Sequence, residues 1–346
     1  MLEEKTIDRN QVIGFSLLAA ILLGYTWWAG NQEVVDSQIQ QNNIVENIEE
    51  GSSGGSFNSS EITVDGSIML DDTTSSAENY NGVEEIYTLE NDKVRYTFNS
   101  IGAQLAQVEL KNYKDYLGNP LYLVNGGQKI SGANKGVFKG VVDRKTEGRK
   151  SLSMKNNDGA EWVFSLGDGY GLNWSLSVPD EENITLKWSQ DGIRHEKSLT
   201  NENQYTTTYF FDAEDEKKDY LSNGKDDEDI ASNISWIAHK QQFFSSIWST
   251  DKPFSSVQLA TTTPAVNDSG HTRQFRSVLQ IAGNNNGVNA QGLIYHGPND
   301  YLELKSFDKN FDEIIPFGWG IFGWITRFIL CLCLDSCLEF FLMEFR

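Results

Sequence analysis

The feature that most constrains this chain is a run of seventeen uncharged residues from Val12 to Trp28. Its length is at the short end of what an α-helix needs to cross a hydrocarbon core of about 30 Å. Tyr25, Trp27 and Trp28 stand at its far end, where amphipathic aromatic rings prefer the water–lipid interface. The run therefore predicts a transmembrane helix over residues 12–28.

Positive charge predicts the orientation of that helix. Lys5 and Arg9 precede it, and the next basic residue is Lys93. Basic residues are retained in the cytoplasm. Residues 1–11 are therefore expected in the cytoplasm, residues 12–28 in the cell inner membrane, and the bulk of the chain in the periplasm. The alternative is a cleaved signal peptide, but two tryptophans stand where a cleavage site needs small residues, which favours an uncleaved anchor.

Residues 29–82 have the composition of a flexible linker. The stretch 31–92 holds 14 Asp or Glu and no Lys or Arg, and residues 51–60 read GSSGGSFNSS. Such a segment has too little apolar surface to offset the entropy of ordering. A solvated spacer is therefore expected, with an acidic interaction tail as the alternative.

From residue 83 to 305 the pattern changes to alternating apolar and polar residues. The runs are Val94–Phe98, Leu172–Val178 and Ile184–Trp188, and the turn Pro179–Asn183 predicts that the last two form a hairpin. Glycine-rich breaks separate further short strands, whereas Trp236–Trp248 is ambiguous between helix and strand. The fold class predicted is mainly β, a large antiparallel β-sandwich.

Composition and motifs argue against several functions. The net charge of −21 argues against binding nucleic acid, which requires cations to replace phosphate counterions. No nucleotide-binding, zinc-protease or hydrolase motif is present, and the four histidines have no metal-ligand spacing. The acidic stretch 212–229 reads as a solvated loop. We expect no catalytic residue, no metal and no cofactor, so the chain is not expected to be an enzyme.

The segment 306–330 is amphipathic when drawn as a helix. Phe317, Ile321, Trp324 and Phe328 share one face, and Arg327 lies opposite. This arrangement predicts a helix lying in the membrane interface that leads into the start of a second membrane helix, with a helix packed on the β domain as the alternative. The cysteines, Cys331, Cys333 and Cys337, lie in the tail 331–346, whose acidic residues argue against a clean second span.

Four stretches in order resemble the YidC/Oxa-type family of membrane protein insertases. They are IDRNQVIGFSLLAAILLGYTWW (7–28), WIAHKQQFFSS (236–246), YHGPNDYLELK (295–305) and IIPFGWGIFGWITRFIL (314–330). The residues that carry the two middle motifs are Trp236, Lys240, Gln241, Gln242 and Phe244, and Tyr295, Gly297, Pro298 and Tyr301.

The resemblance implies a β-supersandwich periplasmic domain and a role in inserting and folding nascent inner-membrane proteins in the lipid bilayer, alone or beside the Sec translocon. The family continues into a five-helix core with a functional arginine in a groove, whereas this sequence departs from the family pattern after Leu330. A frameshifted or truncated form is therefore expected, without insertase activity of its own. The alternative function is a membrane-anchored carbohydrate-binding or mutarotase-like domain, which would place a histidine and a carboxylate in one cleft.

Overall fold

The computed structural model describes residues 84–126, 129–131, 136–144 and 149–316. They belong to the second of two units, which divide between Thr73 and Thr74. The expected transmembrane helix with Tyr25, Trp27 and Trp28, the expected linker, and the interface residues Phe317, Ile321, Trp324 and Phe328 lie outside these residues. Within the described part, no helix is both long enough and apolar enough to cross a bilayer.

Strands make up most of the described chain, as alternation predicted. The strands are β1 (Ile86–Glu90), β2 (Val94–Asn99), β3 (Gln104–Lys114), β4 (Pro120–Asn125), β5 (Lys129–Ser131), β6 (Lys139–Arg144), β7 (Lys150–Lys155), β8 (Glu161–Leu166), β9 (Gly171–Val178), β10 (Asn183–Ile193), β11 (Thr207–Asp212), β12 (Lys217–Tyr220), β13 (Asp227–Lys240), β14 (Phe244–Thr262), β15 (His271–Ala282) and β16 (Val288–Pro298). The helices are α2 (Leu199–Gln204), α3 (Tyr301–Lys305) and the 3₁₀ helix η1 (Phe311–Ile314).

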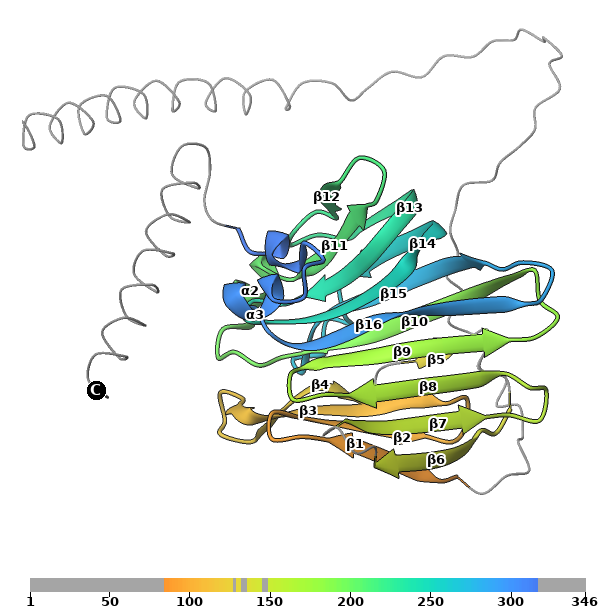
Figure 1. Ribbon diagram of the computed structural model, residues 1–346. Coiled ribbons are helices and arrows are strands. Elements are labelled where there is room, and N and C mark those ends of the chain that lie inside the picture. The colour runs from red at the N-terminus through yellow and green to blue at the C-terminus, as the bar shows by residue number, and fades with distance from the viewer. Residues whose placement is uncertain (1–83, 127–128, 132–135, 145–148, 317–346) are drawn as a thin grey trace, which may run out of the picture. The chain divides into compact units, whose positions relative to one another are not determined.

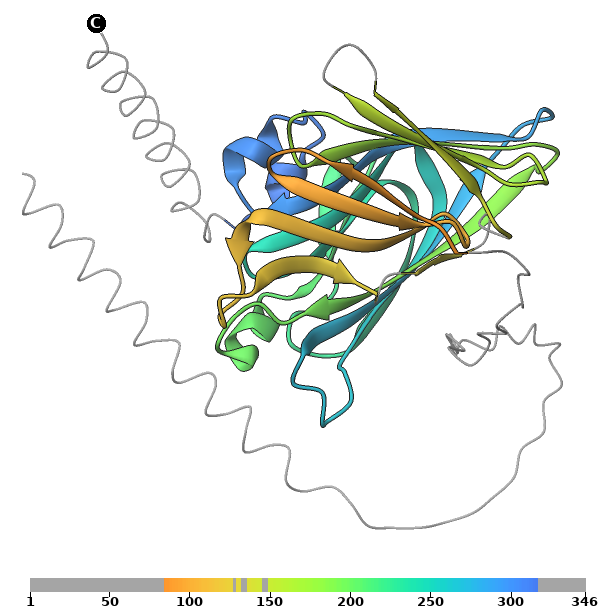
Figure 2. The same ribbon diagram turned by 90° about the horizontal axis from the view of Figure 1, so that it is seen from below.

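Two antiparallel sheets form a sandwich, which confirms the predicted fold class (Figures 1 and 2). The smaller sheet has the order β1-β2-β3-β4. It packs on the branch of the larger sheet that contains β8, where the rings of Phe98 and Phe164 lie 4.5 Å apart. The hydroxyl of Tyr96 also donates to the carbonyl oxygen of Tyr170 at 2.7 Å.

Strand β14 divides the larger sheet into two branches. Its first part pairs with β16 and its second part with β15, while β13 runs along both parts. One branch continues as β16-β9-β8-β7-β6, and the other as β15-β10-β5. This nineteen-residue strand therefore holds both branches together.

The predicted hairpin between β9 and β10 is wrong. β9 pairs with β8 and β16, whereas β10 pairs with β15 and β5. The turn between β9 and β10 lies beside the turn between β15 and β16, where the amide of Gly283 donates to the carbonyl oxygen of Glu182 at 2.7 Å. β9 and β10 thus pair with β16 and β15, which follow later in the sequence. The residues of the turn between β9 and β10 do not specify this choice of partners.

The ambiguous stretch Trp236–Trp248 forms the end of β13 and the start of β14. Nearly every residue there is buried, including the charged Lys240. Central strands covered on both faces lose the apolar–polar alternation, which explains why periodicity could not identify them. The acidic stretch 212–229 is exposed for much of its length, as expected, but it also contains the short edge strand β12.

The core continues beyond residue 305. Phe311 and Ile314 in η1 are fully buried in the same apolar cluster as the strands, and so is Leu304 in α3. The indole nitrogen of Trp236 donates to the carbonyl oxygen of Lys309 at 2.9 Å, and the ammonium of Lys218 donates to that of Glu313. Residues 306–314, which the sequence placed in the interfacial segment, therefore contribute to the domain.

Candidate functional site

The two middle motifs meet at one end of the β domain. The first forms the end of β13, a tight turn and the start of β14, and the amide of Gln241 donates to the carbonyl oxygen of Phe244 at 2.8 Å to close the turn. The second forms the end of β16 and the whole of α3. Because Ser246 pairs with His296 and Phe244 with Pro298, the motifs lie side by side.

Asn299 connects the two motifs, although the sequence did not single it out. Its side-chain amide donates to the carbonyl oxygens of Gln241 at 2.9 Å and Gln242 at 3.3 Å. Its side-chain oxygen accepts from the hydroxyl of Ser245 at 2.6 Å, and its backbone amide donates to the carbonyl oxygen of Phe243 at 2.7 Å. The only sequence signal was its place between Pro298 and Asp300, the residue that caps α3.

Most of the motif residues stabilise this end of the domain. The side-chain amide of Gln241 donates to the carbonyl oxygen of Ile193 at 2.7 Å, and the hydroxyl of Tyr295 donates to that of Pro298 at 2.6 Å. A Cβ at Gly297 would lie 2.6 Å from the Tyr295 ring, so that position requires glycine. Buried Phe244 packs edge-on against Tyr113.

Lys240 and Gln242 connect this end to α2. The ammonium of Lys240 donates to the carbonyl oxygen of Tyr205 at 3.3 Å, and burial lowers its pKa to about 8. The side-chain oxygen of Gln242 accepts from Asn201 at 3.4 Å. Within α2, the buried carboxyl of Glu202 accepts from the backbone amides of His195 and Glu196, and burial raises its pKa to about 7.

A small cleft of about 410 Å³ opens beside α3. Lys93, Tyr170 and Glu303 line it, together with Pro298 from the second motif. The Lys93 ammonium lies 3.4 Å from the Glu303 carboxylate and 5.1 Å from the centre of the Tyr170 ring. Tyr301 lies on the same helix, half-buried, with the Lys305 ammonium 5.2 Å from its ring centre.

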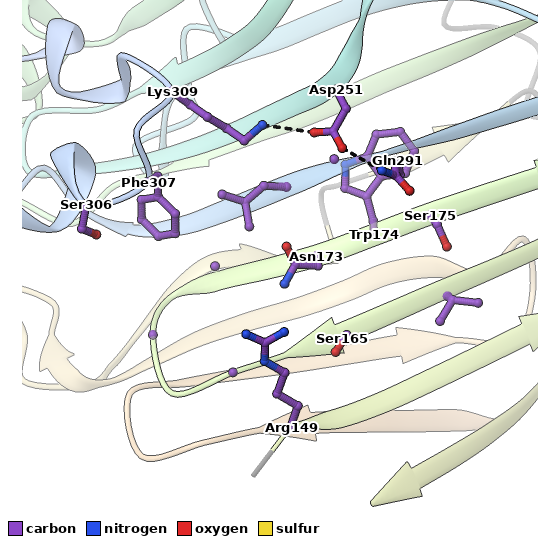
Figure 3. Close-up of a pocket in the computed structure, with 16 residues that line it drawn as sticks. Arg149, Ser165, Asn173, Trp174, Ser175, Asp251, Gln291, Ser306, Phe307 and Lys309 are labelled. Carbon is purple, nitrogen blue, oxygen red and sulfur yellow. Dashed lines mark hydrogen bonds and ion pairs between the residues drawn. The ribbon is translucent and has the colours of Figure 1, made fainter. Parts of the chain in front are cut away.

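A larger groove of about 600 Å³ crosses the outer face of β8, β9 and β16 (Figure 3). Its floor has small or polar side chains at Gly171, Asn173 and Ser175. Phe307 and Lys309 stand on one side, and Lys309 forms an ion pair of 3.1 Å with Asp251, which accepts from Gln291 at 2.9 Å. Arg149 lies on the opposite side.

Carboxylates line both clefts, but neither is lined by the histidine that a mutarotase-like site would place beside one. His195, His239 and His296 are buried inside the domain, and burial lowers the pKa of each. His271 is the first residue of β15 and is partly exposed, with its ring nitrogen Nδ1 2.8 Å from the Asp268 carboxylate. Both clefts combine polar groups with aromatic rings, as binding sites commonly do.

A family model described as the YidC periplasmic domain matches residues 149–332, just over half of the chain. The chain belongs to the YidC periplasmic domain family. The match starts at β7 and includes the groove floor and both middle motifs. The four-stranded sheet precedes it.

Proteins named membrane protein insertase YidC are similar along almost the whole chain. The protein of Phocaeicola vulgatus is 25% identical over 93% of this chain and 56% of its own length. That of Parabacteroides distasonis is 26% identical over 95% and 59%, and that of Amoebophilus asiaticus 27% identical over 94% and 58%. The chain thus spans a little over half the length of these YidC relatives.

Solved structures with a similar arrangement include a putative aldose 1-epimerase from Escherichia coli K12. It has a TM-score of 0.41 and 10% identity, over 62% of this chain and 99% of that one. A galactose mutarotase-like protein from Lactobacillus casei has a TM-score of 0.39 and 11% identity, over 62% and 100%. At such scores the likeness says nothing of function.

Proposed function

We propose that the chain is the N-terminal part of a YidC-type insertase and chaperone, which binds nascent inner-membrane proteins and does not act as an enzyme. The observation that supports this most is the similarity to YidC insertases along more than nine-tenths of the chain. The Sec translocon is a further proposed partner.

The proposed topology follows from the charge distribution of the sequence. Residues 1–11 lie in the cytoplasm, residues 12–28 span the inner membrane, and residues 29–82 connect the span to the periplasmic β domain. The β domain then returns to the membrane, where Phe317, Ile321, Trp324 and Phe328 enter the interface. In this topology a client that emerges from the bilayer meets the periplasmic domain.

Within the domain, the groove across β8, β9 and β16 is the proposed contact surface for clients. Its floor combines the small or polar residues Gly171, Asn173 and Ser175 with the apolar side chain of Leu293, so it offers both polar and apolar contacts to an extended segment. Phe307 offers apolar contact on one side, and Arg149 and Lys309 offer hydrogen-bond donors to backbone carbonyls.

Photo-crosslinking tests this proposal. A photoreactive residue at Asn173, on the groove floor, should cross-link to a nascent inner-membrane protein in intact membranes. Ser177 is the matched control, because it lies on the same face of β9, is also exposed, and does not line the groove. Equal cross-linking at both positions would exclude the groove as the contact surface, and no cross-link to any client at either would count against the insertase role.

A further inference from the structure

Five large apolar or aromatic side chains are exposed at the end of the domain where the motifs meet. They are Tyr116, Leu117, Tyr205, Phe243 and Leu302, each between 42% and 69% exposed. We call them the end patch. They come from four elements, namely the β3–β4 turn, the residue after α2, the β13–β14 turn and α3. In both views α2, α3 and the β3–β4 turn gather at the left end of the domain (Figures 1 and 2).

Hydrogen bonds connect these elements in one series. The amide of Tyr116 donates to the carbonyl oxygen of His195, just before α2, at 3.0 Å. The carbonyl oxygen of Tyr205 accepts from Lys240, and that of Phe243 accepts from the amide of Asn299, just before α3. These hydrogen bonds therefore hold the four elements that carry the patch together at one end of the domain.

The described chain ends at this same end of the domain. Ile314 is fully buried in η1, which packs beside α3, and Pro316 is the last described residue. Phe317, the first residue of the predicted interfacial face, follows Ile314 by three positions. Three residues span at most about 11 Å, so no slack separates the domain from that segment.

Distance then decides which part of the domain can reach lipid. β16, with eleven residues, is about 36 Å long and runs from the far end of the domain to this one. A backbone link of about 11 Å allows the end that holds Ile314 to touch the headgroups but keeps the far end of β16 away from them. The residues of the end patch suit a lipid headgroup surface, because tyrosine prefers the water–lipid interface. The guanidinium of Arg194, a group that can reach headgroups, lies 4.6 Å from the centre of the Tyr116 ring.

We propose that the end patch rests on the periplasmic headgroup surface of the bilayer, so that the domain stands upright on the membrane from which its chain emerges. This inference rests on the proposed membrane anchoring. The occupant is lipid, and not a partner protein, because the short link from Ile314 holds the patch at the bilayer whatever else is bound.

Lipid quenching in vesicles tests the proposal with the full chain. Cys331, Cys333 and Cys337 are replaced by serine, and single cysteines are placed at Leu117, Phe243 or Leu302 and labelled with an environment-sensitive fluorophore. The controls are Ile230, ten residues before Lys240 on β13, and Val142 on edge strand β6, both exposed and apolar. The labelled protein is reconstituted in phosphatidylcholine–phosphatidylglycerol vesicles that carry nitroxide-headgroup lipid.

We expect loss of fluorescence at the three patch positions and none at the two control positions. Flotation of the vesicles first shows whether the chain is anchored, so a failure of the anchoring proposal is seen separately. Protein that floats but loses no more fluorescence at the patch than at the controls would overturn the inference. So would patch labels that are shielded in native membranes but not quenched in pure lipid, because a partner protein would then cover the patch.

Discussion

At the residue scale, buried histidines make the domain sensitive to acid. His296 is fully buried, and neither ring nitrogen has a hydrogen-bond partner among the described residues. Burial lowers its pKa from 6.5 to about 3. Between these values the unfolded chain binds a proton that the folded chain does not, so the free energy of unfolding rises with pH across the window and is flat above it.

The substitution His296→Phe should remove this contribution. We expect the slope of unfolding free energy against pH, measured by tryptophan fluorescence in urea, to fall by about 1.4 kcal/mol per pH unit at pH 5 and by about half of that at pH 6.5, where the unfolded histidine is half protonated. His195 and His239, whose pKa values burial also lowers, add slopes of the same sign that remain in the variant. Glu202 opposes them, because its raised pKa adds stability that is lost as pH rises from about 4.5 to 7. The exposed His271→Phe is the control, and an unchanged slope in His296→Phe would contradict the assignment.

Asn299 gives a second prediction at this scale. Asn299→Ala removes three side-chain hydrogen bonds that join the two motifs, which should lower the free energy of unfolding by about 2 kcal/mol. Asn289→Ala, at an exposed position of β16, should change it by less than about 0.5 kcal/mol. Equal effects of the two substitutions in urea unfolding would show that the side-chain hydrogen bonds of Asn299 do not contribute to the free energy of unfolding.

The sequence could indicate the motif residues but not what they do. Trp236, Gln241 and Tyr295 were singled out by resemblance, and the structure brings them to one end of the domain through the pairing of β14 with β16. Asn299 was missed because a loop residue between two elements has no periodicity to mark it. The groove was missed as well, because its lining comes from strands β8, β9 and β16 and from residues 306–309, which only the fold brings together.

At the scale of elements, α3 and η1 close the core after the last strand. The Phe311 ring lies 5.9 Å from Trp236 and 5.8 Å from Phe307, in each case between ring centres. Alternation along Val94–Phe98 predicted β2 because one face of that strand is buried. No such pattern marks η1, whose single turn is placed only by the core it covers.

The substitution Phe311→Ala should therefore lower the free energy of unfolding by about 3–5 kcal/mol, the usual effect of deleting a buried aromatic ring. Proteolysis should then cleave near residues 306–316 before it cleaves the strands. Leu302→Ala, half-exposed in α3, is the matched control and should be near neutral. Resistance to proteolysis like that of the unaltered protein would mean that η1 does not depend on this ring.

At the scale of the whole molecule, charge asymmetry predicts the topology. A reporter that is active only in the periplasm should be active when it is fused near Gly55. The reason is that Lys5 and Arg9 precede the predicted span and no other basic residue occurs before Lys93. The same reporter fused before Val12 is the control and should be silent. Cytoplasmic activity at Gly55 would reverse the proposed orientation.

The domain should also fold alone when its last core residues are included. A fragment of residues 84–316 should be monomeric with a β-dominated circular dichroism spectrum. A fragment of 84–305 lacks Phe311 and Ile314, and should unfold at lower urea concentration. A helical or disordered spectrum for the longer fragment would contradict domain autonomy.

The late positions of β15 and β16 in the sequence have a consequence for the timing of folding. β9 pairs with β16 and β10 pairs with β15, so two early strands wait for partners about a hundred residues later, while β1–β4 pair locally. A chain that crosses a membrane from its N-terminus onward can assemble the small sheet first, but the large sheet only after Pro298 has emerged. Until then β9 lacks its β16 neighbour, so the groove proposed to contact clients is complete only when nearly all of the domain has been delivered.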